Sequence, residues 1–256
     1  MRHEFVRRWA AGVLVAGLVA GLAGCASGGD GPKRGDDVDR VVDPNIRLAQ
    51  AYLAAGKFDL AMDRATRAVR SAPSSAEAHV VMGMVLERLE EDGRAGEHYL
   101  RAAKHAPDQG FALNAAGVWL CEHGRGAEAE PLFAQAVDDL LYSQRLKVFH
   151  NAGKCAADRG DLAHAEQYLR GGLNLVADDP HLLEQMVRVK FLQGDVLGAR
   201  AFLQRREALG APGPALLGLA VKIEERAGDA AAAQRYRQQL ANQHPGYTAP
   251  ANGSQP

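Results

Sequence analysis

Cysteine and aromatic residues are scarce in this 256-residue sequence, which has three cysteines, two tryptophans and 6% aromatic residues in all. Three cysteines are too few for a disulfide-dense scaffold, in which many bridges take the place of a core. Charge of one sign is lacking as well, because 30 lysines and arginines face 31 acidic residues. Without a basic excess to hold a phosphate backbone, we expect no nucleic-acid partner.

The sequence also lacks the motifs that carry chemistry. It contains no glycine-rich loop ending in Lys-Ser or Lys-Thr, no His-Glu-x-x-His helix and no Gly-x-Ser-x-Gly turn. His98 and His105 bracket a predicted helix end without a third ligand. We therefore expect no enzyme activity, no metal, no cofactor and no small-molecule substrate.

Alternating apolar and polar runs typical of β-strands are absent, which favours an all-α fold. In their place the sequence contains a repeat. Six alanines recur at spacings of 34, 34, 36, 34 and 34 residues, at Ala61, Ala95, Ala129, Ala165, Ala199 and Ala233. A second series of small or β-branched residues keeps the same spacings, at Ala49, Gly83, Gly117, Gly153, Val187 and Val221. A period of about 34 is that of the tetratricopeptide helix–turn–helix unit, and the small residues mark where its two helices cross closely.

The two series divide residues 42–247 into six tetratricopeptide repeats that form a right-handed superhelical solenoid. The predicted units are 42–75, 76–109, 110–145, 146–179, 180–213 and 214–247, and the third carries two extra residues near Asp138–Arg145. Glycine is expected at the turn inside a unit, where a helix often ends on a left-handed residue. It occurs there in five units, and Glu90 replaces it in the second. Bulky apolar residues are predicted to fill the core, at Leu48, Tyr52, Met82, Leu86, Tyr99, Leu120, Phe133, Leu169 and Leu203.

The beginning of the chain has the pattern of a secretion signal. Basic residues precede Trp9–Ala23, an apolar run of 15 residues that is short for a membrane span. The run ends in Leu22-Ala23-Gly24-Cys25, which resembles the lipobox of bacterial lipoproteins. That resemblance implies a signal peptide at 1–24 and lipidation of Cys25, and an ordinary signal peptide with an incidental cysteine is the alternative. Because the next residue is Ala26 rather than aspartate, lipoprotein sorting in Gram-negative bacteria would imply the outer membrane, with the protein facing the periplasm.

Two segments have compositions that cannot bury a core. Residues 25–41 are rich in glycine and charge, and predict an acylated N-terminus followed by a flexible tether. Residues 248–256 are similar and predict a disordered tail.

Cys121 and Cys155 are the cysteines that remain in an oxidising compartment. Both lie on the first helices of their units, three and four, and such helices pack side by side. We therefore expect a disulfide between them, and two buried free thiols are the alternative.

Several segments carry a family resemblance. They are Asn114–Cys121, Asn151–Cys155, Ala165–Leu169 and Ala199–Leu203. Together with the lipobox, the six repeats and the paired cysteines, they resemble the type IV pilus biogenesis/stability lipoproteins, the PilF/PilW pilotin family. The chain departs from that family near Asp138–Arg145, where a proline-containing loop is usual.

The resemblance implies a function. Members of the family escort the secretin, the outer-membrane ring through which the pilus emerges, and promote its localisation and multimerisation. The implied partners are therefore the secretin and, through the N-terminal lipid, the membrane. The alternative is an outer-membrane tetratricopeptide adaptor that scaffolds peptidoglycan enzymes or outer-membrane assembly machinery.

The concave groove of a tetratricopeptide stack is lined by set positions of each first helix. In the first three units these positions predict an apolar partner-binding groove, formed by Ile46, Leu53, Val80, Met84, Phe111 and Val118. In the last three units they carry charged residues, among them Lys154, Asp158, Arg188 and Lys222. An apolar stripe of this kind suits an amphipathic helix or an extended tail of a partner, although packing against neighbouring first helices would explain it equally well.

Overall fold

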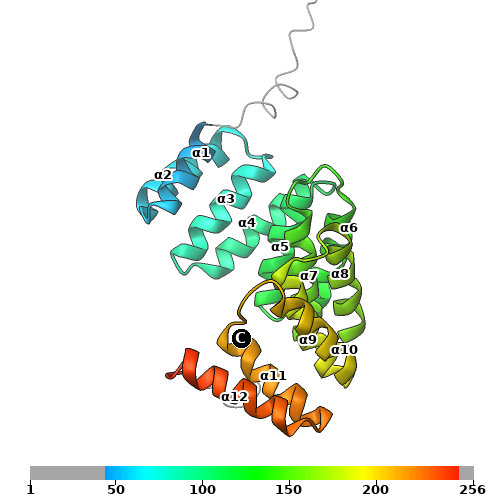
Figure 1. Cartoon of the computed structure of the whole chain (residues 1–256). Coiled ribbons are helices and arrows are strands. Elements are labelled where there is room, and N and C mark those ends of the chain that lie inside the picture. The colour runs from blue at the N-terminus through cyan, green and yellow to red at the C-terminus, as the bar shows by residue number, and fades with distance from the viewer. Residues whose placement is uncertain (1–43, 248–256) are drawn as a thin grey trace, which may run out of the picture. The chain divides into compact units, whose positions relative to one another are not determined.

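The computed structural model describes residues 44–247, and this part of the chain is built from helices in consecutive pairs (Figure 1). The described residues contain no strand, so the all-α prediction is confirmed. The predicted signal peptide, tether and tail lie outside the described residues. The helices are α1 Pro44–Ala54, α2 Phe58–Ser71, α3 Ala76–Arg88, α4 Asp92–His105, α5 Gly110–Glu122, α6 Gly126–Asp138, α7 Arg145–Asp158, α8 Leu162–Leu175, α9 Pro180–Leu192, α10 Val196–Glu207, α11 Pro214–Ala227 and α12 Ala230–Gln243.

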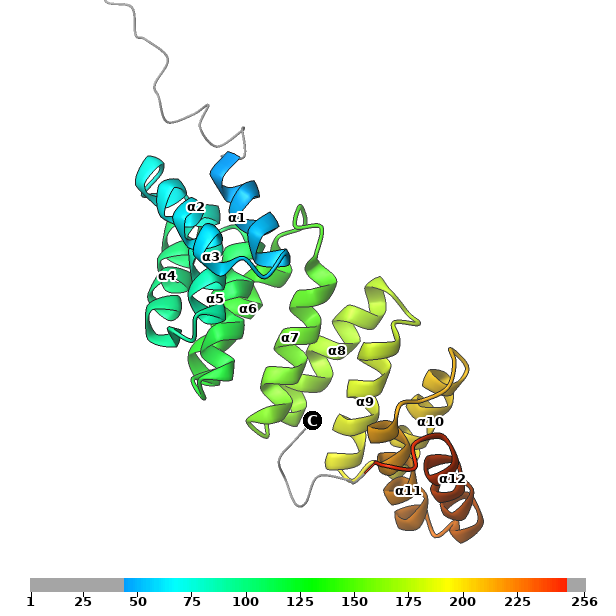
Figure 2. The ribbon, with the colours of Figure 1, turned by 90° about the vertical axis from the view of Figure 1, so that its left-hand side faces the viewer.

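The pairs stack in sequence order. Each odd-numbered helix packs most closely against the even-numbered helix that follows it, and each even-numbered helix packs against the first helix of the next pair. The first helices also contact one another from pair to pair, so α1, α3, α5, α7, α9 and α11 lie side by side (Figure 2). This arrangement is the predicted tetratricopeptide solenoid. Each predicted unit holds one pair, except that α7 begins at Arg145, one residue before the predicted fourth unit. No helix among the described residues is both long and apolar enough to cross a membrane.

The helices of each pair cross at the small residues that define the repeat. All six periodic alanines are fully buried. On the first helix, a Cβ added to Gly83 would lie 2.7 Å from the Tyr99 ring, and one added to Gly153 would lie 2.7 Å from Leu169. Such distances are shorter than those of real Cβ contacts, so a larger residue at these two positions would force the facing side chain to shift.

The turns inside the pairs use the left-handed conformation. Glycine has a positive φ in five of them, from 68° at Gly56 to 82° at Gly160. In the second unit Glu90 takes the same conformation with φ 60°, and it is the one non-glycine residue with positive φ among the residues described. The turn geometry is therefore a property of the repeat, since it persists where the side chain disfavours it.

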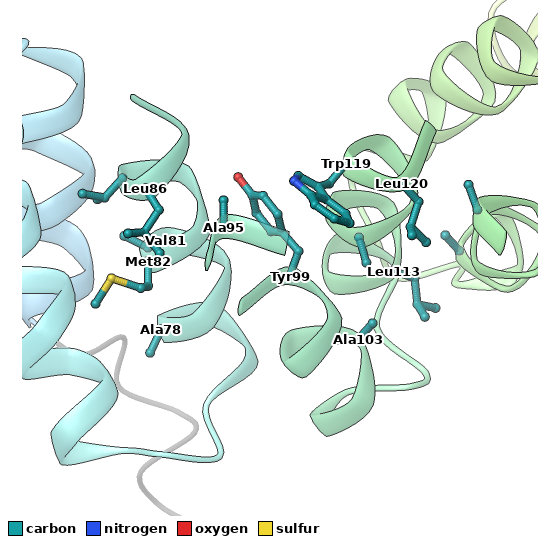
Figure 3. Packing of buried hydrophobic residues seen from close by; sticks show 14 of the residues in the cluster. Ala78, Val81, Met82, Leu86, Ala95, Tyr99, Ala103, Leu113, Trp119 and Leu120 are labelled. Carbon is teal, nitrogen blue, oxygen red and sulfur yellow. The ribbon is translucent and has the colours of Figure 1, made fainter. Parts of the chain in front are cut away.

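The core runs through the stack as a series of apolar clusters. Figure 3 shows the largest, in which the rings of Tyr99 on α4 and Trp119 on α5 meet between the second and third units. A Cβ on Gly96 would overlap the Trp119 indole, so this glycine makes the space that the indole fills. Most of the predicted core residues are buried, but Leu48 is not, because 39% of its surface is exposed.

A single stripe on α1 explains the error at Leu48. Ile46, Ala49 and Leu53 are spaced by three and four residues, so they share one face of the helix. Ile46 and Ala49 are buried on that face, and Leu48 lies off it.

The two extra residues of the third unit lie in the connection between α6 and α7. The Asp139 carboxylate accepts hydrogen bonds from the backbone N–H groups of Gly110 at 2.8 Å, Leu141 at 3.0 Å and Tyr142 at 3.2 Å. These bonds, beginning with that from Gly110, lower the pKa of Asp139. The insertion is thus an ordered loop.

Candidate partner-binding face

The predicted apolar groove falls on adjacent helices. Leu53 is on α1, Val80 and Met84 are on α3, and Phe111 and Val118 are on α5, and these three helices contact one another in order. The structure therefore brings these residues onto neighbouring first helices. We call the side of α1, α3, α5, α7, α9 and α11 that carries these residues and their equivalents in later units the first-helix face.

The burial of these side chains shows how much of them is open. Met84 is the most accessible, with 40% of its surface exposed. Leu53, Val80, Phe111 and Val118 are half-buried, because each also packs against a core cluster. These residues therefore support the stack and still expose apolar surface.

Ile46 does not belong to this face, and its inclusion in the groove was wrong. Only 3% of its surface is exposed, and it lies in the main core cluster with Ala49 and Ala65. Leu53 lies two turns later on the same side of α1 and is half-buried, so this side of the helix becomes accessible only towards its C-terminal end.

Beyond α5 the first-helix face becomes polar. The Asn151 amide on α7 donates a hydrogen bond of 2.9 Å to the Asn114 oxygen on α5. Asp158 on α7 pairs with Lys154 at 2.6 Å and with Arg188 on α9 at 3.2 Å. This cross-helix link was not foreseen from the sequence, although the periodic register places Lys154 and Arg188 at equivalent positions.

His150 lies on α7 beside a carboxylate. Its Nε2 is 3.1 Å from Asp179. Burial lowers the pKa of His150, while Asp179 acts in the opposite direction. The described residues contain no group of three metal-binding side chains.

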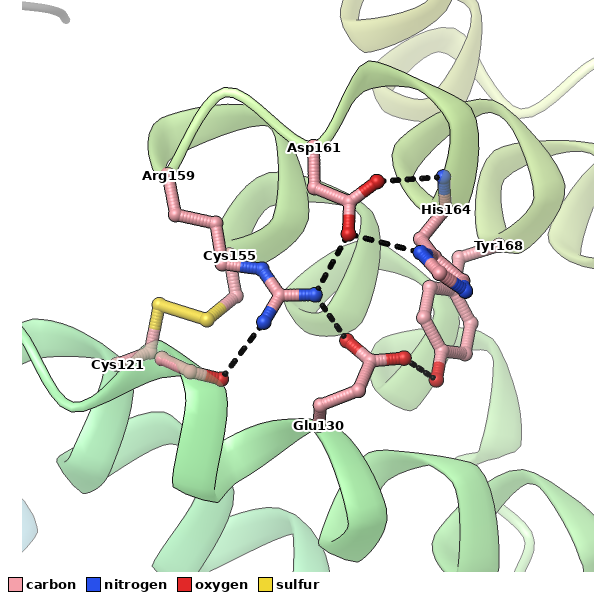
Figure 4. Close-up of polar contacts among 8 residues, drawn as sticks. Cys121, Glu130, Cys155, Arg159, Asp161, His164 and Tyr168 are labelled. Carbon is pink, nitrogen blue, oxygen red and sulfur yellow. Dashed lines mark hydrogen bonds and ion pairs between the residues drawn. A yellow bond between two sulfur atoms is a disulfide. The ribbon is translucent and has the colours of Figure 1, made fainter.

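Cys121 on α5 and Cys155 on α7 are joined by a disulfide in the structure, with their Cα atoms 5.8 Å apart (Figure 4). Their helices are adjacent first helices of the third and fourth units. A polar cluster lies beside the bridge, in which Arg159 pairs with Glu130 at 3.0 Å and with Asp161 at 2.9 Å. The Tyr168 hydroxyl donates to Glu130 at 2.7 Å. The junction of these two units therefore combines a covalent link with half-buried polar bonds.

A curated relative identifies the family. The type IV pilus assembly protein PilF of Pseudomonas aeruginosa PAO1 is 30% identical over 191 residues, which cover 74% of this chain and 76% of the relative. The chain belongs to the PilF family. No family model matches it.

Two solved structures place this PilF-family chain in the same fold. The structure of Pseudomonas aeruginosa PilF matches with a TM-score of 0.69 at 27% identity, covering 80% of this chain and 92% of that one. PilW, described as a widely conserved type IV pilus biogenesis factor, matches with a TM-score of 0.72 at 26% identity, covering 79% of this chain and 93% of that one. The tetratricopeptide fold and the family resemblance are therefore confirmed, and the chain is a type IV pilus biogenesis protein of this family.

Proposed function

We propose that this PilF-family protein is a pilotin, an outer-membrane lipoprotein that binds the type IV pilus secretin and promotes its localisation and multimerisation. In this proposal the lipid on Cys25 holds the protein at the outer membrane, and the solenoid faces the periplasm. Its binding surface is the first-helix face of the first three units.

The observation that carries the proposal is the accessible apolar surface on α1, α3 and α5, in a chain of the PilF family. Solenoids of this kind present an extended surface to protein partners. Met84 lies on the middle of these three helices and is the most exposed of the predicted groove residues. When a partner removes apolar side chains in such a position from water, the free energy of the complex falls.

The test is a double substitution, Leu53→Glu with Met84→Glu. Two apolar contacts are lost and two carboxylates would have to be desolvated against the partner, so secretin binding should be abolished. Cells with this variant should contain secretin monomers in place of heat-stable multimers, and should lose surface pili and twitching motility. Charge reversals at Lys154 and Lys222 should weaken binding less.

A matched control uses two exposed leucines of the second helices, Leu60 on α2 and Leu100 on α4. Leu60→Glu with Leu100→Glu adds the same charge and removes similar apolar groups, but away from the first-helix face. Because Leu53 also packs against the core, Met84→Glu alone serves as the variant that leaves the fold intact. If the folded, anchored Met84→Glu and double variants both support secretin multimers as well as the control does, this face is not the binding surface.

A further inference from the structure

The ninth residue of each unit forms a series with a change in charge halfway along. These residues share the 34, 34, 36, 34 and 34 spacing of the crossing alanines, so they occupy equivalent places on the first-helix face: Gln50, Met84, Val118, Lys154, Arg188 and Lys222. The first three are uncharged, two of them apolar, and the last three are cationic. We call Lys154, Arg188 and Lys222 the cationic series.

Contacts within the face leave the cationic series only partly neutralised. Asp158 lies between two of its members, 2.6 Å from Lys154 Nζ and 3.2 Å from Arg188 Nη1, and one carboxylate offsets one of these two charges. Lys222 makes no ion pair within residues 44–247. Neither does Lys147, which lies two turns before Lys154 on α7 and so shares its side of the helix.

Acidic residues on the same helices are neutralised from elsewhere. Glu184 on α9 is 3.6 Å from Arg206 of α10, and Glu225 on α11 pairs with Arg237 of α12. The second helices thus supply the cations that satisfy these carboxylates. The first-helix face of the last three units is left with a positive excess, in a chain whose net charge is −1.

We infer that the cationic series binds acidic side chains of the same extended protein segment whose apolar part lies on α1, α3 and α5. This inference rests on the proposed function and specifies the chemistry of the partner segment. Adjacent packed helices are about 8–10 Å apart and an extended chain advances about 3.3 Å per residue, so every third residue of the segment meets one unit. By this spacing the segment is about 15 residues long, apolar in one half and with Asp or Glu at about every third position in the other.

The pattern of charge favours a protein segment over an anionic membrane or another polyanion. The cations are presented one per unit in single file, with Asp158 between two of them, and they continue the series of Met84 and Val118 in the same register. A phosphate polyanion is held by cations that each neutralise a phosphate, and a carboxylate between two such cations repels it. Separate charges at this spacing match side-chain carboxylates, which steer the segment and fix its register.

The experiment uses the full mature protein in detergent and fluorescent peptides of about 15 residues, the length derived above, that overlap along the whole secretin. Peptides that bind should carry acidic residues in one half, and their affinity should fall with added salt. Lys154→Glu with Arg188→Glu and Lys222→Glu should weaken binding by at least about tenfold, the effect of losing a few charge contacts. The matched control, Arg67→Glu with Arg101→Glu and Arg235→Glu, changes the same number of charges on second helices and should have little effect.

A charge exchange gives the decisive result. Replacing the acidic residues of a bound peptide with lysine should abolish its binding to the original protein and restore binding to the triple variant. Lys147→Glu with Lys222→Glu, which breaks no ion pair, should weaken binding in the same direction and guards against misfolding of the triple variant.

Three results would overturn the inference. The first is that the bound peptides lack acidic residues, and the second is that the triple variant binds them as the control does. The third is that the triple variant loses binding to phosphatidylglycerol vesicles but binds every peptide as the original protein does. The face would then be a lipid surface. If Met84→Glu still abolishes secretin binding in any of these cases, the proposed function stands without the acidic contact. If Met84→Glu has no effect either, both proposals fail together.

Discussion

At the scale of single residues, the solenoid depends on small side chains where the two helices of a unit cross. Ala165 has no exposed surface at the crossing of α7 and α8, and Gly153 opposite leaves room for Leu169. Close-packed interiors have no free volume for additional methylene groups, so a larger residue must push the helices apart. The register of the repeats can therefore be tested at one alanine.

Ala165→Leu should destabilise the protein by roughly 1–3 kcal/mol, because overpacking forces off-rotamer side chains and shifts of the backbone. Ala231 on α12 is exposed, so Ala231→Leu is the matched control and should cost little. Urea denaturation followed by circular dichroism measures both. Equal losses of stability at the two positions would mean that the repeat register is misplaced.

A histidine pair in the second unit is a second residue-scale feature, and the sequence pattern did not reveal it. His79 Nε2 lies 3.0 Å from the Pro73 carbonyl, which can only accept, so the ring must carry its proton there. With both rings neutral, its Nδ1 is an acceptor, and His98 Nδ1, 2.9 Å away, donates to it. Burial favours this neutral state because it lowers the pKa of both rings. If both rings were protonated, two N–H groups would face each other.

The pair should make stability depend on pH. Burial lowers the pKa of His98 to about 4, with further lowering from His79 and Arg101, and burial also lowers the pKa of His79. Because these values lie below those of the unfolded chain, the unfolded state binds more protons in acid. The contribution of the neutral pair to the free energy of unfolding is fully present above about pH 6.5, the ordinary pKa of histidine. It is lost as the pH falls towards about 4.

We therefore expect the Tm to fall between about pH 7 and about pH 5, and to fall less in His98→Gln, which keeps a hydrogen-bond donor without titrating. Thermal melts at the two pH values provide the measurement. His244→Gln is the control, at a residue outside this cluster on the last helix cap. An unchanged pH dependence in His98→Gln would show that the pair does not control acid stability.

At the scale of helices, the residue after the crossing alanine links its unit to the next from the second unit to the fifth. Gly96 accommodates Trp119, and from the third unit onward the links are ion pairs. These pairs are Glu130–Arg159 at 3.0 Å, Glu166–Lys190 at 2.8 Å and Arg200–Glu224 at 3.0 Å. One structural position thus serves the same role with different chemistry along the stack.

The disulfide adds to this junction at the third and fourth units. Cys121 and Cys155 are 34 residues apart, and a bridge closing such a loop stabilises a fold by on the order of 3–4 kcal/mol in the chain-entropy model. Natively isolated mature protein should therefore show one bridge by intact mass before and after alkylation. Cys121→Ala with Cys155→Ala should unfold at lower denaturant concentration. Two freely alkylated thiols in natively isolated protein would contradict the bridge.

The sequence was sufficient for the architecture because the helix crossing is a strict constraint. A position that must be small in every unit repeats visibly, and even the replacement at Glu90 keeps the left-handed turn. The faces of single helices were harder to predict. Ile46 and Leu48 are both apolar residues near the start of α1, and only the direction in which α2 and α3 cover that helix decides which is buried.

The links between units were beyond sequence reasoning for a related reason. The period places Glu130 and Arg159 in adjacent units, but it does not show which of several nearby charges will pair. The same holds for Asp158, which pairs with both Lys154 and Arg188 and so links α7 to α9. Pairing depends on how far each side chain reaches across a helix interface, and a periodicity carries no such information.

At the scale of the whole molecule, the proposed function requires that the solenoid be held at the outer membrane. No helix among residues 44–247 can cross a bilayer, and Cys25 lies outside the described residues. The apolar run at Trp9–Ala23 has 15 residues, whereas a transmembrane helix needs about 20. Acylation of Cys25 would supply the anchor that these segments do not, since multiple acyl chains hold a protein stably in a membrane.

Changing Cys25 to Ser should therefore leave an unprocessed or soluble periplasmic form. Radiolabelled palmitate should enter the original protein and not the variant, and sucrose-gradient fractionation should move the variant out of the outer-membrane fraction. The purified variant should keep the helicity of the original and still bind secretin peptides in solution, because the first-helix face is formed by residues 44–247 alone. If the Cys25→Ser protein remains quantitatively in the outer membrane after a high-salt wash, the lipid anchor is wrong. The solenoid would then have to reach the membrane through its protein partner.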